Sequence, residues 1–126
     1  MASQTKHAPI CSINCRIADT QFTIHGVRFI GFTELNSMTS IQKSMSIAFF
    51  YDEIASEMFD MESLGKTLEI VSISREGKER IAEENQWTIC SIGEVSYDPA
   101  FNRMLMGISL DYEVRGFFPE YDTNHR

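Results

Sequence analysis

The chain has 126 residues, of which 43% are apolar and 23% are charged, and its formal net charge is −7. These proportions are close to those of folded globular proteins, so they exclude a wholly disordered chain, and the length fits one ordinary domain. The acidic balance argues against binding along a nucleic-acid backbone, because that affinity comes mainly from lysine and arginine.

Membrane insertion and disulfide bonding are also not expected. No apolar run reaches the roughly 18 residues that a membrane span needs, and the first residues lack the apolar core of a signal peptide. Cys11, Cys15 and Cys90 have no zinc-ribbon spacing, and an odd number of cysteines argues against a disulfide framework. We expect each cysteine to be a small buried hydrophobic residue in a reducing cytosol.

The N-terminal third predicts two strands after a flexible leader at residues 1–10. Apolar and polar residues alternate over residues 11–17, which is the period of a strand with one buried face. A second run at residues 22–29 contains Gly26, which indicates a bulge or a bend. This region is either a strand pair or an assembly arm. Residues 34–41 read as a polar connection.

A long helix is expected over residues 53–72, directly after a third strand at residues 44–50. Asp52 stands where an N-cap residue would. Apolar residues follow at helical spacing along one face: Ile54, Met58, Met61, Leu64, Leu68 and Val71. Residues 67–73 also alternate as a strand would, and we favour the helix. Ser74 then caps a second, short helix that carries residues 78–84.

The C-terminal third predicts a β-hairpin. Its strands cover residues 87–95 and 103–115, and a turn at residues 97–102 joins them. The second strand places six residues on one buried face: Met104, Met106, Ile108, Leu110, Tyr112 and Val114.

These elements together predict an α+β fold: a largely antiparallel sheet with one long helix and one short helix packed on one face. A single α+β domain would span residues 11–118, and residues 119–126 would form a polar C-terminal tail. We find no internal repeat and no linker.

No residue pattern indicates catalysis, a cofactor or a metal. His7, His25 and His125 lack metal-binding spacing, and Gly65-Lys66-Thr67 lacks the upstream glycine of a phosphate-binding loop. The clustered acids are expected on a solvated helix surface: Asp52, Glu53, Glu57, Asp60 and Glu62. The basic cluster of Arg75, Lys78 and Arg80 is interleaved with glutamates, which is typical of a solvated helix face. We therefore expect a protein that is not an enzyme.

The order of elements resembles the tail-terminator, or neck and tail-completion, proteins of tailed bacteriophages. The resemblance covers roughly residues 44–116, and these segments carry it: Ser46-Ile47-Ala48-Phe49-Phe50-Tyr51-Asp52, the helix opening Glu53-Ile54-Ala55, a short helix ending near Asn85, Trp87-Thr88-Ile89-Cys90-Ser91-Ile92-Gly93-Glu94-Val95 and a last strand from Arg103.

The resemblance implies a structural virion protein, made in the host cytoplasm, with no catalytic residues. Copies would form a ring, typically a hexamer, that caps the tail tube and joins it to the head connector, so the partners are further copies, tail-tube proteins and connector proteins. The alternatives are a small α+β adaptor or binding module and, less favoured, a small enzyme.

Aromatic residues after the last strand are candidates for a subunit or partner interface. Phe117, Phe118 and Tyr121 follow one another too closely for all the rings to face one core from a strand. Either at least one ring lies against a neighbouring subunit or partner, or Phe117 and Phe118 close the bottom of the domain's own core.

Overall fold

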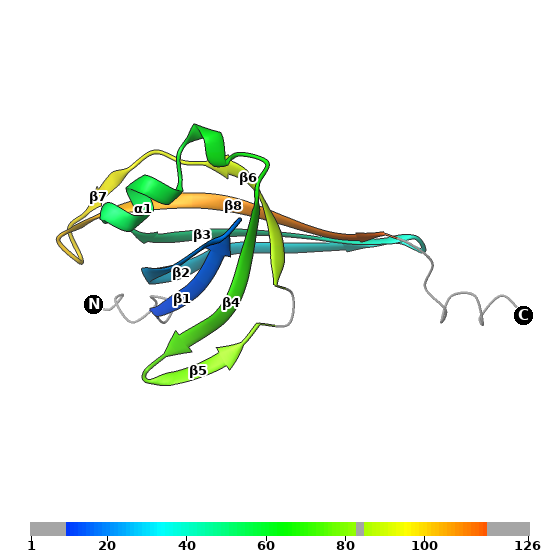
Figure 1. Ribbon diagram of the computed structural model, residues 1–126, viewed down its shortest axis with the longest axis horizontal. Coiled ribbons are helices and arrows are strands. Elements are labelled where there is room, and N and C mark those ends of the chain that lie inside the picture. Colours follow the sequence, from blue (N-terminus) through cyan, green and yellow to red (C-terminus); the bar gives the residue numbers. More distant parts are fainter. Residues whose placement is uncertain (1–9, 83–84, 116–126) are drawn as a thin grey trace, which may run out of the picture.

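The computed structural model describes residues 10–82 and 85–115, and strands dominate them (Figure 1). In chain order the strands and helices, including one 3-10 helix η2, are β1 (Cys11–Ile17), β2 (Thr20–Asn36), β3 (Ser40–Phe50), α1 (Glu53–Met58), η2 (Met61–Ser63), β4 (Thr67–Arg75), β5 (Lys78–Ile81), β6 (Gln86–Ile92), β7 (Ser96–Asp98) and β8 (Arg103–Arg115).

Six strands close into an antiparallel barrel. Their order is β1-β2-β3-β8-β6-β4, and β4 pairs back onto β1 from Ser12 opposite Ser74 to Ile17 opposite Leu68. The strands β5 and β7 add to β4 and β8 outside this ring of pairings. The predicted α+β fold is therefore wrong, because the sheet closes on itself and buries its apolar face without a covering layer of helices.

The core fills the barrel with the inward-facing side chains of alternating strand positions. In β1 these are Cys11, Ile13, Cys15 and Ile17, so the strand predicted at residues 11–17 is confirmed. Phe59, which directly follows α1, adds to this core. Its ring packs against the rings of Phe22 and Phe49, with centroid distances of 5.7 and 5.2 Å. The segment with α1 and η2 lies on the opposite side of the barrel from β5 (Figure 1).

The predicted long helix over residues 53–72 is also wrong. Asp52 caps α1 as expected, with its carboxylate accepting from the Ala55 N–H at 2.9 Å, but the helix ends at Met58. Asp60 starts η2, and Gly65 then adopts a φ of +85°, which a helix does not contain. The residues after it form β4, where Leu68 is fully buried as a strand residue. Of the predicted helix face, Ile54, Met61 and Leu64 are exposed.

A strand also replaces the predicted short helix. Glu76 and Gly77 have φ values of 53° and 78°, and two such residues form the tight turn that joins β4 to β5. Ile73 thereby pairs with Arg80, so the basic residues lie on a hairpin rather than on a helix.

The remaining differences lie in the lengths of the strands. Residues 34–41 are the end of β2, a short turn and the start of β3, not a polar connection. The strands β6 and β8 pair antiparallel as predicted, and β7 forms within the segment assigned to their turn. Met106, Ile108 and Leu110 are buried as predicted, whereas Met104 is exposed.

Candidate functional site

Three strands continue past the barrel as an arm, which we define as residues 30–45 and 110–115 (Figure 1). Pairing between β2 and β3 runs on to Asn36 opposite Ile41, but β1 contacts β2 only as far as Val27. Pairing between β3 and β8 runs on to Ser40 opposite Arg115, whereas β6 contacts β8 only as far as Asp111. The arm is thus a three-stranded ribbon with no barrel strand beside its outer half.

Side-chain contacts hold the arm in register. Ser44 donates to the carboxylate of Asp111 at 2.9 Å, and the side-chain amide of Gln42 donates to Glu113 at 3.3 Å. At the next position the Lys43 ammonium lies 5.9 Å from the ring centroid of Tyr112. Such cross-strand pairs are the units that stabilise a sheet. These contacts fix the pairing of the three strands of the arm.

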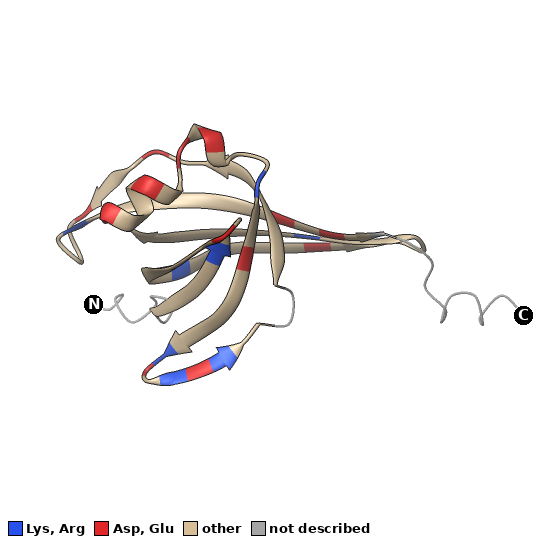
Figure 2. Ribbon diagram, viewed as in Figure 1, with Lys and Arg blue, Asp and Glu red and all other residues tan. Residues whose placement is uncertain are grey.

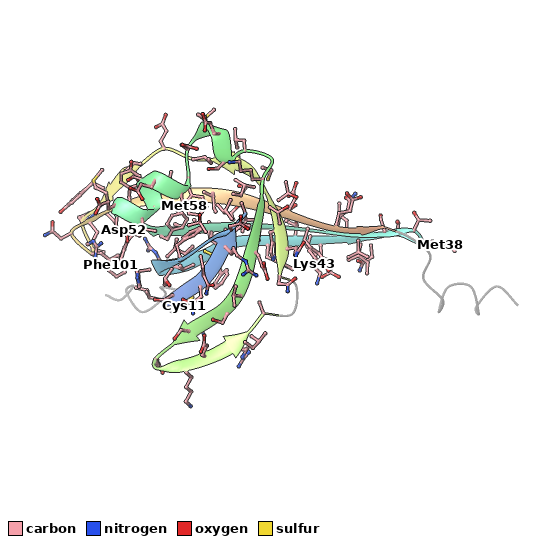
Figure 3. All side chains as sticks on the ribbon, viewed as in Figure 1. Cys11, Met38, Lys43, Asp52, Met58 and Phe101 are labelled. Carbon is pink, nitrogen blue, oxygen red and sulfur yellow. The ribbon has the colours of Figure 1, made fainter. Side chains whose placement is uncertain are left out.

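Exposed apolar side chains gather along β2 and the tip of the arm. Ile30 and Leu35 are 67% and 68% exposed, and Phe32 is 58% exposed. Met38, at the tip, is 52% exposed and is labelled in Figure 3. Phe32 and Leu35 are three positions apart, so they lie on opposite faces of the ribbon, and both faces of this strand carry exposed apolar side chains. Single exposed apolar residues are common on protein surfaces, whereas a series along one strand is a candidate for contact with another chain.

The outer half of β2 is also an open sheet edge. Residues 28–36 pair with β3 on one side, and the described part of the chain places no strand on the other side. A register shift between Phe29 and Gly31 leaves Ile30 without an opposite residue, as in a β-bulge. A long open edge with apolar side chains is a template for pairing with another chain.

A cleft lies between the base of the arm and the β4–β5 hairpin. Its cavity measures about 450 Å³, and its lining is mostly apolar: Phe29, Phe32, Met45, Ile70, Ile73, Arg80, Ile81, Ala82 and Trp87. A connected hollow of about 460 Å³ continues from Phe29 and Ile73 along the hairpin. A cleft of this volume is within the range of ligand pockets and is large enough for one or two aromatic side chains of a peptide.

The hairpin presents its basic residues to this cleft. Arg75 pairs with Lys78 and Ile73 pairs with Arg80, and residues paired directly opposite share one face of a sheet. The three cations therefore lie on the face of Ile73, which lines the cleft. Figure 2 shows the alternating charges along β5.

Glu79, the acidic residue of β5, lies on the other face of the hairpin from Arg80. Glu79 pairs with Ser74, and its carboxylate accepts from the Ser72 hydroxyl at 2.5 Å and from the Asn14 side-chain amide at 3.3 Å. The Ser72 hydroxyl donates to Glu79 and accepts from the Asn14 amide at 2.8 Å, so its hydrogen bonds are satisfied although Ser72 is only 1% exposed. Glu76 and Glu79 also line the hollow beside the three cations, but the Glu79 carboxylate is held by Ser72 and Asn14.

A charged and aromatic cluster joins the middle of β2 to the β7–β8 hairpin, at the end of the barrel away from the arm tip. The Arg28 guanidinium bonds Asp98 at 2.8 Å and lies 5.0 Å from the ring centroid of Phe101, while Arg103 lies 4.1 Å from that of Phe50. Phe101 and Met38 mark the two ends of the molecule in Figure 3. Because these cations are already engaged, we assign the cluster to stabilising the barrel end.

The cysteines, histidine and acids considered from sequence do not converge. Cys11 and Cys15 are buried, but Cys90 is exposed, which corrects the expectation that all three are buried. Burial raises the pKa of Cys15 to about 12, and that of Cys11 is raised for the same reason, so these thiols stay protonated and unreactive. His25 Nδ1 lies 3.1 Å from the Ser12 hydroxyl. In residues 10–82 and 85–115 no group of three potential metal ligands occurs.

Two of the acids have structural roles. Asp52 caps α1 and Asp60 caps η2, where its carboxylate accepts from the Glu62 N–H at 3.1 Å. Glu53, Glu57 and Glu62 are exposed.

The predicted interface residues Phe117, Phe118 and Tyr121 lie outside the described residues, as do His7 and His125. The sequence predicted strands through residues 44–45 and 110–115, but not that they join residues 30–43 in an arm, and it did not predict the cleft. The signal for the arm was available: Asn36-Ser37-Met38-Thr39-Ser40 is a short polar turn between two runs that each contain apolar residues at alternate positions.

No protein family, curated protein or solved structure matches this chain. Neither of the helices in the described part of the chain is long and apolar enough to cross a membrane.

Proposed function

We propose that this chain is a structural subunit that assembles with copies of itself into a ring. The proposal places the ring in a virion, where it caps the tail tube and joins it to the head connector. The observation that carries it is the open edge of β2 with its exposed Ile30, Phe32 and Leu35. The virion setting rests on the resemblance in the sequence of the strands near residues 44–52 and 87–115, since the long helix is absent.

The energetics favour strand pairing over apolar contact alone. Burying three such side chains contributes about 1.5–3 kcal/mol each, or about 5–9 kcal/mol together. Association costs about 4–15 kcal/mol in lost freedom of the partners, so the apolar residues roughly offset that cost without leaving a surplus. The backbone groups of residues 28–36 supply the further hydrogen bonds that a lasting contact needs.

The acidic composition suits a ring through which DNA passes. A net charge of −7 on each copy would repel the phosphate backbone and keep it from adhering to the ring. The same charge also serves solubility, so it supports the proposal without distinguishing it from other functions.

A small binding module is the second candidate function, and the cleft favours it. An apolar floor beside three cations suits a peptide that carries aromatic and acidic residues. This reading requires a monomer that binds a different protein, whereas the ring requires self-assembly.

Electron microscopy of the wild-type protein and two variants tests the proposal. We expect closed rings for the wild type and separate subunits for Ile30→Lys/Leu35→Lys, because charges on the open edge of β2 oppose pairing. Met61→Lys is the matched control, since Met61 is 73% exposed and lies on η2, away from the arm. Rings that persist in the double variant contradict an assembly through the arm.

A further inference from the structure

The cleft at the base of the arm has two chemically different parts. Its floor is apolar, with Phe29, Phe32 and Ile73 accessible beside the buried Trp87. Its outer wall is the face of the β4–β5 hairpin that carries Arg75, Lys78 and Arg80. An occupant that suits both parts needs aromatic and acidic side chains within a few residues of each other.

The wall is positively charged, although the chain as a whole is negatively charged. Residues 75–80 contain three basic and two acidic side chains, a net charge of +1, in a chain whose net charge is −7. Glu76 and Glu79 also line the hollow, but the Glu79 carboxylate accepts a hydrogen bond from Ser72, and Glu76 lies in the turn. The described ion pairs, Arg16 with Glu69 and Arg28 with Asp98, involve none of these cations. The cations are therefore placed to meet a negative partner.

The chain itself contains a segment of the required chemistry. Directly after β8 the sequence reads Gly116-Phe117-Phe118-Pro119-Glu120-Tyr121-Asp122, with three aromatic and two acidic residues in seven. Glu120 and Asp122 are opposite in charge to Arg75, Lys78 and Arg80, so the segment complements the wall in charge as well as in aromatic character. We propose that the cleft binds residues 117–122 of a second copy of this chain.

The position of the end of β8 favours a second copy over the same copy. Leu110 pairs with Met45, a lining residue of the cleft, and β8 continues outward for five more residues to Arg115 at the tip of the arm. Five strand residues span about 17 Å, whereas a reversal at Gly116 returns the backbone of Phe118 by only about 10 Å. Such a reversal would leave Phe117 and Phe118 short of the cleft of their own copy and would bring only Tyr121 and Asp122 to it, whereas the cleft of a neighbouring copy could take all three rings.

Such a contact is heterologous, because the tip of one copy meets the base of the next. Repeated contacts of this kind close into a ring when the rotation between copies permits it. The inference thus rests on the proposed ring and names the segment and the surface that join its subunits.

Charge reversal on the full chain tests the inference. The cleft variant is Lys78→Glu/Arg80→Glu, and the tail variant is Glu120→Lys/Asp122→Lys. Each alone places like charges against each other, so each should raise the dissociation constant of assembly about tenfold or more. Glu53→Lys/Glu57→Lys, on the exposed face of α1, is the matched control and should assemble as the wild type does.

Mixing the two variants distinguishes a neighbouring copy from the same copy. In an equimolar mixture every tail can meet a cleft of opposite charge on the other variant, so assembly should return to near the wild-type level. Recovery in a chain that carries all four substitutions, but not in the mixture, would mean that the segment binds its own cleft and would overturn the inference. Unchanged assembly of both variants would also overturn it, while leaving the ring itself standing.

Binding of a peptide tests the cleft separately if the wild-type protein does not assemble. That result would contradict the proposed ring, and a labelled peptide of residues 116–123 would then be titrated against the full-length tail variant. Binding that is lost when Lys78→Glu/Arg80→Glu is added supports the cleft as its site. An absence of saturable binding, or binding unaffected by these substitutions, overturns it.

Discussion

The ring of Phe50 lies against the backbone of Gly26, so close that a Cβ atom added to Gly26 would come within 2.6 Å of the ring. Gly26 has a φ of +64° in β2, a conformation that L side chains rarely adopt. Phe50 cannot easily move aside, since it packs on Phe101 at 5.8 Å and beneath Arg103 at 4.1 Å. This contact joins the bend in β2 to the charged and aromatic cluster at the end of the barrel.

Gly26→Ala should therefore destabilise the fold by about 2 kcal/mol or more, from backbone strain and overpacking together. Gly65→Ala isolates the strain, because Gly65 has a φ of +85° but no atom within 4 Å of an added Cβ. Gly31→Ala has neither effect and should change stability by less than about 0.5 kcal/mol. Urea unfolding of the three variants measures these differences. A cost for Gly26→Ala no larger than that for Gly65→Ala would contradict the close contact.

The segment after α1 gives a second prediction, because its residues are buried in the pattern of a strand and not of a helix. Leu68→Ala should lower the free energy of unfolding by about 2–5 kcal/mol, as for a fully buried leucine. Met61→Ala, at a position 73% exposed, should cost less than about 0.5 kcal/mol. A helix over residues 53–72 would place both residues on one buried face. If chemical denaturation shows a similarly large loss of unfolding free energy for both variants, the result would contradict the strand and support the helix.

The misassigned helix shows what sequence periodicity can and cannot resolve. Leu68 and Ile70 point inward as alternating strand residues do, but past the bulge the next inward residue is Ile73, opposite Ile13. The polar Ser72 between them is buried on the other face, where Glu79 and Asn14 bond it. That polar residue interrupts the apolar alternation, and the chance spacing of Ile54, Met61 and Leu64 then completes a helical pattern. No local pattern reports the distant partners of Ser72.

Closure of the barrel was equally inaccessible from sequence, whereas single strands were not. The strand at residues 11–17 is recognisable because one of its faces is wholly buried and the other is polar. Its pairing with β4, more than 50 residues away, depends on the curvature of the whole sheet. The cleft could not be predicted for the same reason, since Phe29, Arg80 and Trp87 come together only when the barrel closes. The Glu76-Gly77 turn was missed because it lacks the more familiar Asn-Gly or Asp-Gly pair.

The cysteines give a third prediction about labelling. Cys90 is exposed and should be the first to react with a maleimide in the folded protein, while Cys11 and Cys15 should react only on unfolding. The pKa of Cys90 is nevertheless raised, by partial burial and by the Asp111 carboxylate, so its labelling should be slower than that of a free thiol and should accelerate with pH. Asp111→Asn should accelerate it at fixed pH. Mass spectrometry at timed intervals counts the adducts, and equal labelling rates for all three thiols would refute this assignment.

Burial of Cys15 also makes a fourth prediction, for stability at high pH. The folded protein holds this proton up to a pKa of about 12, whereas an unburied thiol loses it near 9.0. The unfolded state therefore binds fewer protons between these values, and the contribution of Cys15 to stability is complete below pH 9 and declines as the pH rises. Cys15→Ala should flatten this decline in a pH series of urea unfolding curves. An identical slope in wild type and variant would exclude Cys15 as its source.

The molar mass of the wild-type protein in solution, measured by light scattering across a range of concentrations, tests the central claim most directly. An open β2 edge that carries Ile30, Phe32 and Leu35 predicts a discrete mass that is a whole multiple of the subunit mass and is retained on dilution. In Ile30→Lys/Leu35→Lys the mass should fall toward that of one subunit, with the melting temperature little changed. A single-subunit mass for the wild type at every concentration would contradict self-assembly through the arm.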